Sequence, residues 1–142
     1  MKKLVLFDID GTLLSCGKQV GRIFLQALSE TYGSFRQPEN YSFAGKTDPL
    51  LAIEMVRGAG LNLGDIHSRL PRMHDLYVKR LEQELDAAQM QVLPGVLDLL
   101  DRLSRRDDLV LGLLTGNWRQ GAHIKLSRFE LGRFFTFGAF GD

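Results

Sequence analysis

The N-terminal stretch that decides the fold is Leu4-Val5-Leu6-Phe7-Asp8-Ile9-Asp10-Gly11-Thr12. Its first four residues are a short apolar run, and the Asp-Ile-Asp-Gly that follows has the composition of a turn. An apolar run closed by a turn predicts a strand that is buried on both faces, as the strands of parallel sheets are. We therefore expect the chain to open with a strand of a parallel sheet.

Two later segments have the same strand pattern. Residues 109–114 are an apolar run ended by Thr115-Gly116-Asn117, and residues 135–140 predict a third strand. The remaining pattern is helical, so the order is strand, helical insertion, helix, strand, helix, strand. This order predicts an α/β fold, a doubly wound parallel sheet (Rossmann-like core) with right-handed crossovers.

The insertion after the first strand has the periodicity of amphipathic helices. Apolar side chains recur every three or four residues over 20–31 and over 66–85, and Pro71 is expected to kink or divide the second of these helices. Asp48 followed by Pro49 predicts a further helix with Asp48 as its N-cap. These helices predict an inserted α-helical cap subdomain.

The pattern divides the chain into two parts. We expect an α/β core made of residues 1–14 and 91–142, and a helical cap made of residues 15–90. A chain of 142 residues, 44% hydrophobic and 25% charged, has the length and composition of one globular unit.

Charge and cysteine content exclude several classes of partner. The 18 basic and 17 acidic side chains give a formal net charge of +1, which provides no overall field for nucleic acid or an anionic membrane surface. No stretch approaches the roughly 20 apolar residues of a membrane-spanning helix. Cys16 is the only cysteine, which excludes an internal disulfide. We expect a cytoplasmic protein that binds neither nucleic acid nor membranes.

Two carboxylates follow the first predicted strand. Asp8 and Asp10 are two residues apart on extended chain, so they can project to the same side. Because like charges so close repel, a bound cation would stabilise the pair, and oxygen ligands without a Cys or His cluster favour Mg²⁺. A carboxylate can also attack phosphorus, which makes Asp8 a candidate nucleophile that forms an aspartyl-phosphate. Asp10 would be the general acid and base, provided that its neighbours raise its pKa.

A second polar group follows the second predicted strand. The Thr115 side chain and the amides near Gly116 and Asn117 are suitable donors to phosphate oxygens, and Asn117 could cap the helix that opens there. Thr12 adds a hydroxyl beside the carboxylates. Ligands of open parallel sheets bind at the carboxyl ends of the strands, so both groups are expected to form one site for a small phosphorylated metabolite.

These motifs resemble the haloacid dehalogenase-like hydrolase superfamily, in particular its phosphoglycolate phosphatase-like branch. The first family motif, an apolar strand followed by DxDGT, matches residues 4–12, and the second, an apolar strand ending in Thr or Ser, ends at Thr115. The resemblance implies Asp8 as nucleophile and Mg²⁺ ligand, Asp10 as general acid/base with its backbone carbonyl as the second metal ligand, and Thr115 as phosphate ligand. It also implies that the cap loop containing Lys46 reaches the substrate, where Lys46 would meet an anionic group.

The resemblance implies two further motifs that this sequence does not show in their usual places. The family has a Lys after the third strand and an acidic cluster after the next strand, and the sequence ends at Asp142 before either. We expect Lys125, on the helix before the third strand, to be poorly placed as a substitute. The core would then be incomplete at its C-terminus, and the first strand would be an exposed apolar edge open to self-association.

Together, the residues and the resemblance predict a Mg-dependent phosphatase acting on a small phosphomonoester, phosphoglycolate-like or a sugar phosphate. Two alternatives stay open. One is a sugar-phosphate mutase on the same scaffold, and the other is a catalytically incomplete binding module.

Overall fold

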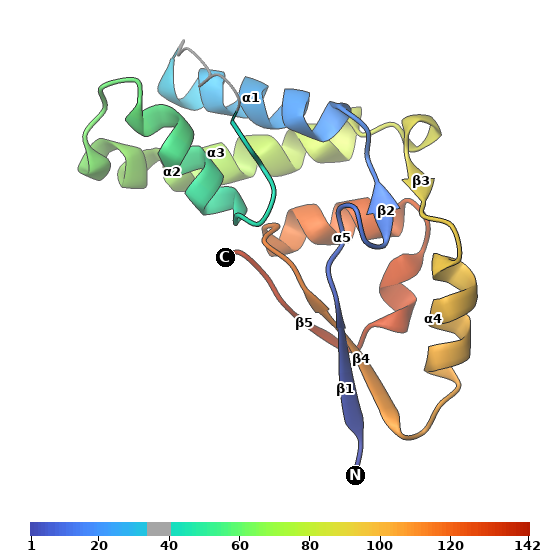
Figure 1. Ribbon diagram of the computed structural model, residues 1–142. Helices are drawn as coiled ribbons and strands as arrows, with labels where there is room; N and C mark the ends of the chain where they lie inside the picture. Colours follow the sequence, from blue (N-terminus) through green and yellow to red (C-terminus); the bar gives the residue numbers. More distant parts are fainter. Residues whose placement is uncertain (34–40) are drawn as a thin grey trace.

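The computed structural model describes residues 1–33 and 41–142 and confirms an α/β fold with a parallel sheet (Figure 1). The sheet has three strands, β1 (Lys3–Phe7), β4 (Leu109–Leu114) and β5 (Phe137–Ala139), in the order β1-β4-β5. Both pairings are parallel. The core helices α4 (Val96–Ser104) and α5 (Arg119–Ser127) form the crossovers, and the short helix η2 (Leu131–Phe134) leads into β5.

Strand register determines which side chains of the sheet are buried. Leu111 and Leu113 alternate with Gly112 along β4, and only their face packs into the core formed with the helices. On the opposite face Leu4 pairs with Val110 and Leu6 with Gly112, while Phe137 lies beside Gly112 with its ring over that glycine. The sheet therefore has one buried face and one apolar face that is open.

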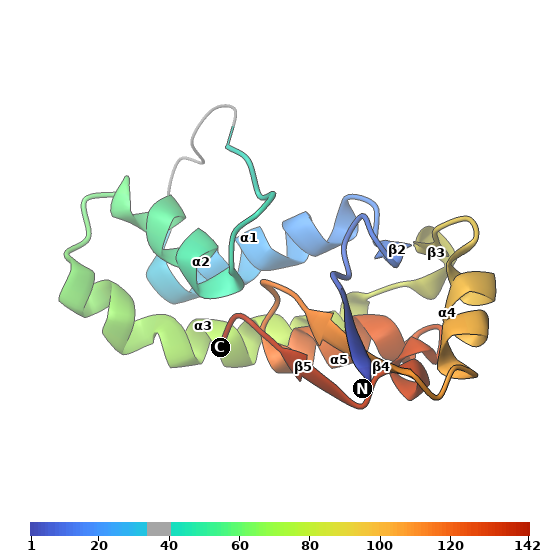
Figure 2. The ribbon, with the colours of Figure 1, turned by 60° about the horizontal axis from the view of Figure 1, so that its bottom comes forward.

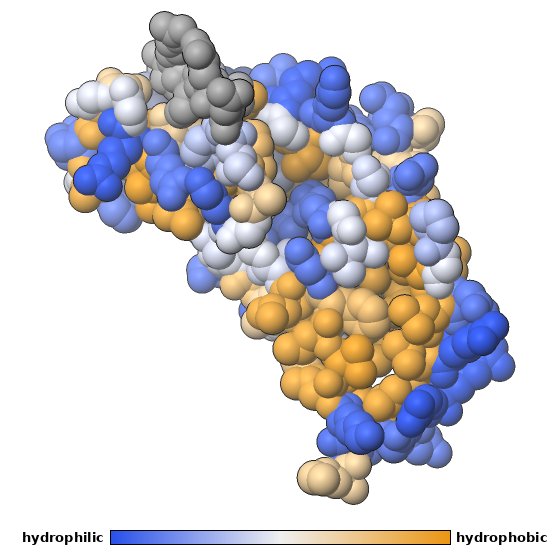
Figure 3. All heavy atoms as spheres, in the orientation of Figure 1, coloured by the Kyte–Doolittle hydropathy of each residue, from blue (hydrophilic) through white to orange (hydrophobic). Residues whose placement is uncertain are grey.

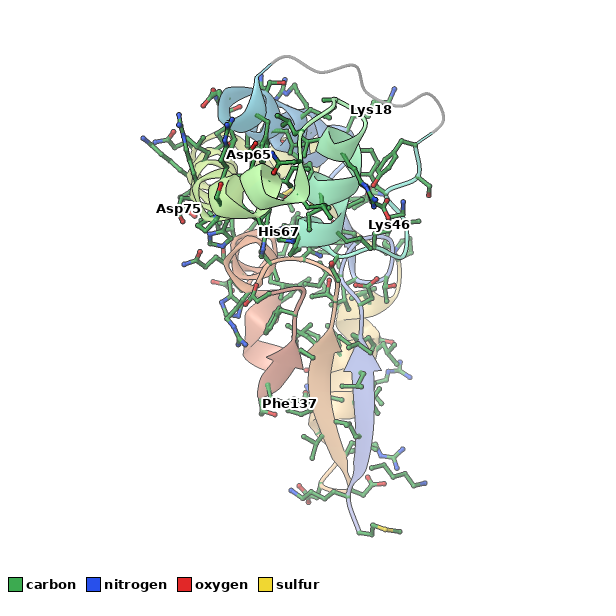
Figure 4. The ribbon with its side chains drawn as sticks, turned by 90° about the vertical axis from the view of Figure 1, so that its left-hand side faces the viewer. Lys18, Lys46, Asp65, His67, Asp75 and Phe137 are labelled. Carbon is green, nitrogen blue, oxygen red and sulfur yellow. The ribbon has the colours of Figure 1, made fainter. Side chains whose placement is uncertain are left out.

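The expectation that the first strand is buried on both faces is wrong. Leu4 is 55% exposed and Leu6 is 44% exposed, because β1 is an edge strand and no element among the described residues covers this side. Figure 3 shows the resulting broad apolar surface over the lower half of the molecule, and Figure 4 views the sheet with α4 behind the strands and Phe137 in front.

The cap consists of α1 (Gln19–Tyr32), α2 (Asp48–Arg57) and α3 (Leu63–Glu84) (Figure 2). Two corrections concern their ends. Thr47, not Asp48, is the N-cap of α2, because its hydroxyl accepts a hydrogen bond from the Leu50 N–H, and Asp48 begins the helix. Pro71 lies inside α3 and does not divide it.

The two chain crossings between core and cap lie side by side. The strand β2 (Leu14–Ser15) leaves the core, and β3 (Gln91–Val92), which follows the short helix η1 (Ala87–Gln89), returns to it; β2 and β3 pair antiparallel. The predicted limits of the cap, residues 15 and 90, lie in or next to this ribbon, and the division into two domains stays a prediction. None of the helices in the described residues combines the length and apolar character of a membrane span.

Cap and core share one hydrophobic cluster. A Cβ atom on Gly121, at the start of α5, would already touch Leu81 and Tyr77 of α3, so these helices pack closely there. The Phe24 ring of α1 stacks on Trp118 with centroids 6.2 Å apart. Apolar burial across this junction therefore stabilises both parts together.

The substitution Leu81→Ala tests this shared packing. Leu81 is fully buried, so its truncation leaves a cavity and should lower the free energy of unfolding by about 2–5 kcal/mol in urea denaturation. Leu97→Ala, at an exposed position of α4, is the control and should change it by less than about 0.5 kcal/mol. Equal effects of the two variants would contradict a common core.

Candidate active site

The turn after β1 places the first two acidic residues. Ile9 is fully buried, and its carbonyl accepts the N–H groups of Thr12 and Leu13, so the chain turns tightly around it. Gly11 has φ of 76°, a conformation that glycine adopts at little cost. Anchored in this way, Asp8 and Asp10 flank a fixed residue, and the Asp8 carboxylate accepts the Ile9 N–H at 2.7 Å.

The turn after β4 lies next to it. Phe7 pairs with Leu113, so the two strands end together and their loops are neighbours. The Asn117 amide nitrogen Nδ2 donates to Asp10 Oδ2 at 2.8 Å and to Thr115 Oγ1 at 2.7 Å. Asn117 thereby joins the two loops. Its side chain does not cap α5, whose N-cap is Trp118 without a side-chain hydrogen bond, so that expectation is wrong.

Lys125 completes this network, and the expectation that it is poorly placed is also wrong. Its side chain is 2% exposed, and Nζ donates to both Asp10 carboxylate oxygens, at 3.0 and 2.8 Å, and to Asn117 Oδ1 at 2.6 Å. Helical side chains lean toward the N-terminus of their helix. A long side chain well along α5 therefore reaches back to the strand ends.

The charges of this cluster shift the pKa values of Asp10 and Lys125. Burial alone would raise the pKa of Asp10, but the charge and hydrogen bonds of Lys125, with the Asn117 bond, hold it below its usual value. Burial alone would lower the pKa of Lys125, yet the carboxylates of Asp10 and Asp48 raise it. The two residues form a charged, hydrogen-bonded pair.

The ion pair between Asp10 and Lys125 contradicts one expectation about the pKa of Asp10. The neighbours of Asp10 were expected to raise its pKa, and Lys125 instead lowers it. In the arrangement described, Asp10 is therefore ionised at neutral pH and has the form of a base rather than an acid.

A cavity of about 1320 Å³ opens above the strand ends, between core and cap. Among the predicted site residues, those that line it are Asp8, Asp10, Lys46, Thr115, Gly116 and Asn117. Thr12 is the exception: it is exposed in the turn after β1 and is not part of the cavity wall. The structure thus brings six of the seven predicted residues to one space.

Lys46 reaches this cavity from the cap (Figure 4). Its ammonium donates to Glu54 Oε2 at 2.5 Å and lies 4.3 Å from the centre of the Tyr41 ring. Lys46 is therefore held on the wall of the cavity by cap residues.

The donor atoms available to a metal ion are oxygens. Within residues 1–33 and 41–142 no group of three or more His, Cys, Asp or Glu side chains is arranged to hold one. Asp8 and Asp10 nevertheless supply two carboxylates at the edge of the cavity, and Mg²⁺ is commonly bound by one or two carboxylates with water and substrate phosphate. The chemistry of these donors fits Mg²⁺ as the sequence predicts.

Comparison with protein families identifies the class. The model of the haloacid dehalogenase-like hydrolases matches residues 5–142, nearly the whole chain. The chain belongs to this family. No curated protein matches it.

Solved structures show the same fold. The chain is similar to a predicted phosphoglycolate phosphatase from Haemophilus somnus 129pt, with 18% identity, a TM-score of 0.65, and coverage of 99% of this chain and 63% of that one. It is also similar to CbbY from Rhodobacter sphaeroides in complex with phosphate, with 20% identity, a TM-score of 0.65, and coverage of 100% and 64%. A Thermotoga maritima protein described as a beta-phosphoglucomutase has 19% identity, a TM-score of 0.50, and coverage of 100% and 62%. The chain thus spans less than two thirds of each of these proteins.

Sequence reasoning missed two residues of the site, Lys125 and Asp48. Lys125 follows Ala122 by three residues and precedes Phe129 by four, so on a helix it lies on the same face as these two apolar residues. A lysine at such a position needs a buried partner, and that was the available signal. Asp48 was noticed only as a cap residue, whereas its carboxylate is buried and accepts the Trp118 N–H at 2.9 Å.

Replacing Lys125 tests the charged pair directly. In Lys125→Met the cation that lowers the pKa of Asp10 is gone while much of the burial remains, so the pKa of Asp10 should rise above its wild-type value. Carbon-13 NMR of the Asp10 carboxyl group during a pH titration measures it. The control is Lys79→Met, at an exposed position of α3, which should leave the pKa unchanged. An Asp10 pKa that stays the same without Lys125 would refute the pairing.

Proposed function

We propose that the protein is a Mg-dependent phosphatase that hydrolyses a small phosphomonoester, phosphoglycolate-like or a sugar phosphate, through an aspartyl-phosphate on Asp8. One observation carries the proposal. Asp8, Asp10, Thr115, Asn117 and Lys125 line a single cavity, and four of them are joined by hydrogen bonds. Membership of a hydrolase family supports the reaction class.

Asp8 is the proposed nucleophile. A carboxylate oxygen of Asp8 forms a bond to phosphorus while the bond from phosphorus to the leaving oxygen breaks, which yields the aspartyl-phosphate and an alcohol. Water then attacks the phosphorus, and the bond to Asp8 breaks to release inorganic phosphate. The position of Asp8 on the cavity wall after β1 suits this role.

The phosphoryl group is negatively charged, and the cavity offers groups that compensate it. The Lys125 ammonium, the Thr115 hydroxyl and the backbone amide of Gly116 all lie on its wall. Preorganised donors of this kind stabilise charge that develops in the transition state. Mg²⁺ held by Asp8 and Asp10 would add a further positive charge at the phosphoryl oxygens.

Asp10 would move the proton in both steps. It gives a proton to the leaving oxygen and later takes one from the attacking water, which requires its protonated form in the first step. Because Lys125 holds Asp10 ionised, we infer that an incoming phosphate draws the Lys125 charge toward itself and raises the proton affinity of Asp10.

The binding-module alternative loses part of its basis. It depended on the absence of both later family motifs, the lysine and the acidic cluster, and for the first of these Lys125 lies on the wall of the same cavity as Asp8. For the substrate, the apolar side chains of Phe24 and Leu51 next to the charged wall suit a small organic phosphate.

The substitution Asp8→Asn tests the nucleophile. With an aryl phosphate and Mg²⁺, it should lower kcat by several orders of magnitude, because an amide oxygen is a poor nucleophile. Asp75→Asn, an exposed cap position, is the matched control and should keep wild-type turnover. The proposal fails if Asp8→Asn retains wild-type turnover, or if the wild type has none with Mg²⁺.

We also propose that the open face of β1 supports self-association. Its exposed apolar side chains, Leu4 and Leu6, lie beside the unpaired backbone of an edge strand, and Phe137 of β5 adds an exposed ring on the same face of the sheet. This combination favours contact with another copy.

Sedimentation at increasing protein concentration tests this association. The wild type should show a rising average mass, and Leu6→Lys should suppress the rise because a charge at the contact must be desolvated. Leu97→Lys places the same charge on α4, away from the edge strand, and should not change it. A wild type that stays monomeric at every concentration would refute the proposal.

A further inference from the structure

Asp48, a residue of the cap, makes two hydrogen bonds to the phosphate loop, residues 115–118. The Asp48 N–H donates to the Gly116 carbonyl at 2.8 Å, and Asp48 Oδ2 accepts the Trp118 N–H at 2.9 Å. These two bonds hold the loop on both sides of Asn117. The Asn117 carbonyl accepts the Gly141 N–H at 2.8 Å, so the outer side of the loop is fixed as well.

The contact is close enough to depend on glycine. A Cβ atom on Gly116 would lie 2.3 Å from the Lys46 carbonyl oxygen, and one on Gly141 would lie 2.2 Å from the Gly116 oxygen. Backbone therefore meets backbone where the cap loop passes the phosphate loop, and a side chain at Gly116 would force the two loops apart. A side chain at Gly141 would instead push the C-terminal residues away from the phosphate loop.

The Asp48 carboxylate is not needed by its own helix. Thr47 already caps α2, whereas Asp48 is buried and directs its acceptor across to the core. Burying a carboxylate is costly, which agrees with a pKa of Asp48 raised by burial to about 6 despite the Lys125 charge. Its bond to Trp118 offsets part of this cost.

The bonds made by Asp48 leave one group of the loop available. The Gly116 N–H has no hydrogen-bond partner in the part of the chain that the structure describes, and Gly116 lines the cavity. Fixing the Gly116 carbonyl and the Trp118 amide also fixes the two peptide planes on either side of Asn117. The backbone of Asn117 is thereby held in the position from which its side chain binds Asp10 and Lys125.

We propose that Asp48 is a positioning residue, through which the docked cap holds the phosphate loop in the geometry that binds the phosphoryl group. This rests on the proposed phosphatase function of the same cavity. It follows that cap docking and phosphoryl binding favour each other, because a ligand held by the fixed loop binds better when Asp48 is in place.

Three variants test this role. Asp48→Ala removes both oxygens of the carboxylate, Asp48→Asn keeps one acceptor of the same shape, and Asp75→Ala truncates an exposed aspartate of the cap as the matched control. Amide hydrogen exchange at Trp118, followed by NMR, reports the contact itself. Exchange should be about tenfold faster or more in Asp48→Ala, and near the wild-type rate in Asp48→Asn and Asp75→Ala.

Inorganic phosphate is the probe for the effect of Asp48 on phosphoryl binding. Titration monitored at the Gly116 and Asn117 amides should give about tenfold weaker binding in Asp48→Ala and near-wild-type binding in Asp48→Asn. With an aryl phosphate, KM should rise more than kcat falls. A merely destabilising change would lower the melting temperature without this pattern and without rescue by asparagine.

Each other outcome overturns a different claim. Unchanged Trp118 exchange in Asp48→Ala would refute the contact, and faster exchange with unchanged phosphate affinity would refute the positioning role alone. A wild type that neither binds phosphate nor hydrolyses the ester would refute the proposed function, and the positioning role with it.

Discussion

The arrangement of the site depends on one buried cation. The Lys125 ammonium is almost fully withdrawn from water, and it is tolerable there only because Asp10 and Asn117 accept its hydrogen bonds. This requirement ties the turn after β1, the loop after β4 and the middle of α5 to one another. Since Asn117 also binds Thr115, removing the cation would leave several polar groups without partners at once. The charge of Lys125 thus holds the turn after β1 and the loop after β4 in fixed positions relative to each other.

Much of the fold and part of the site could be predicted from the sequence. The apolar run before Asp8 and the one before Thr115 both form strands of a parallel sheet, because each is too short for a buried helix and ends in turn residues. Side chains next to strand ends are predictable for the same reason. Lys125 and Asp48 are distant from any strand end in sequence and reach the site only through helix packing, which local patterns do not contain. The exposure of β1 and the unbroken α3 likewise depend on neighbours in space, not on the sequence nearby.

The opposing charges give the site its chemical character. Asp8, Asp10 and Asp48 supply negative charge, and Lys125 is the buried positive charge among them. On the proposed function, a phosphoryl group entering this cavity would compete with Asp10 for Lys125, and substrate binding would then be linked to the protonation of Asp10. Lys125 would then neutralise the charge of Asp10 before the ligand arrives and the charge of the phosphoryl group afterwards, which would limit the electrostatic reorganisation that the proposed reaction requires.

The paired strands β2 and β3 have a mechanical consequence. Both passages of the chain between core and cap run through this ribbon, where Leu14 pairs with Val92 and Ser15 with Gln91. Because these backbones are bonded to each other, a movement of one connection must carry the other with it.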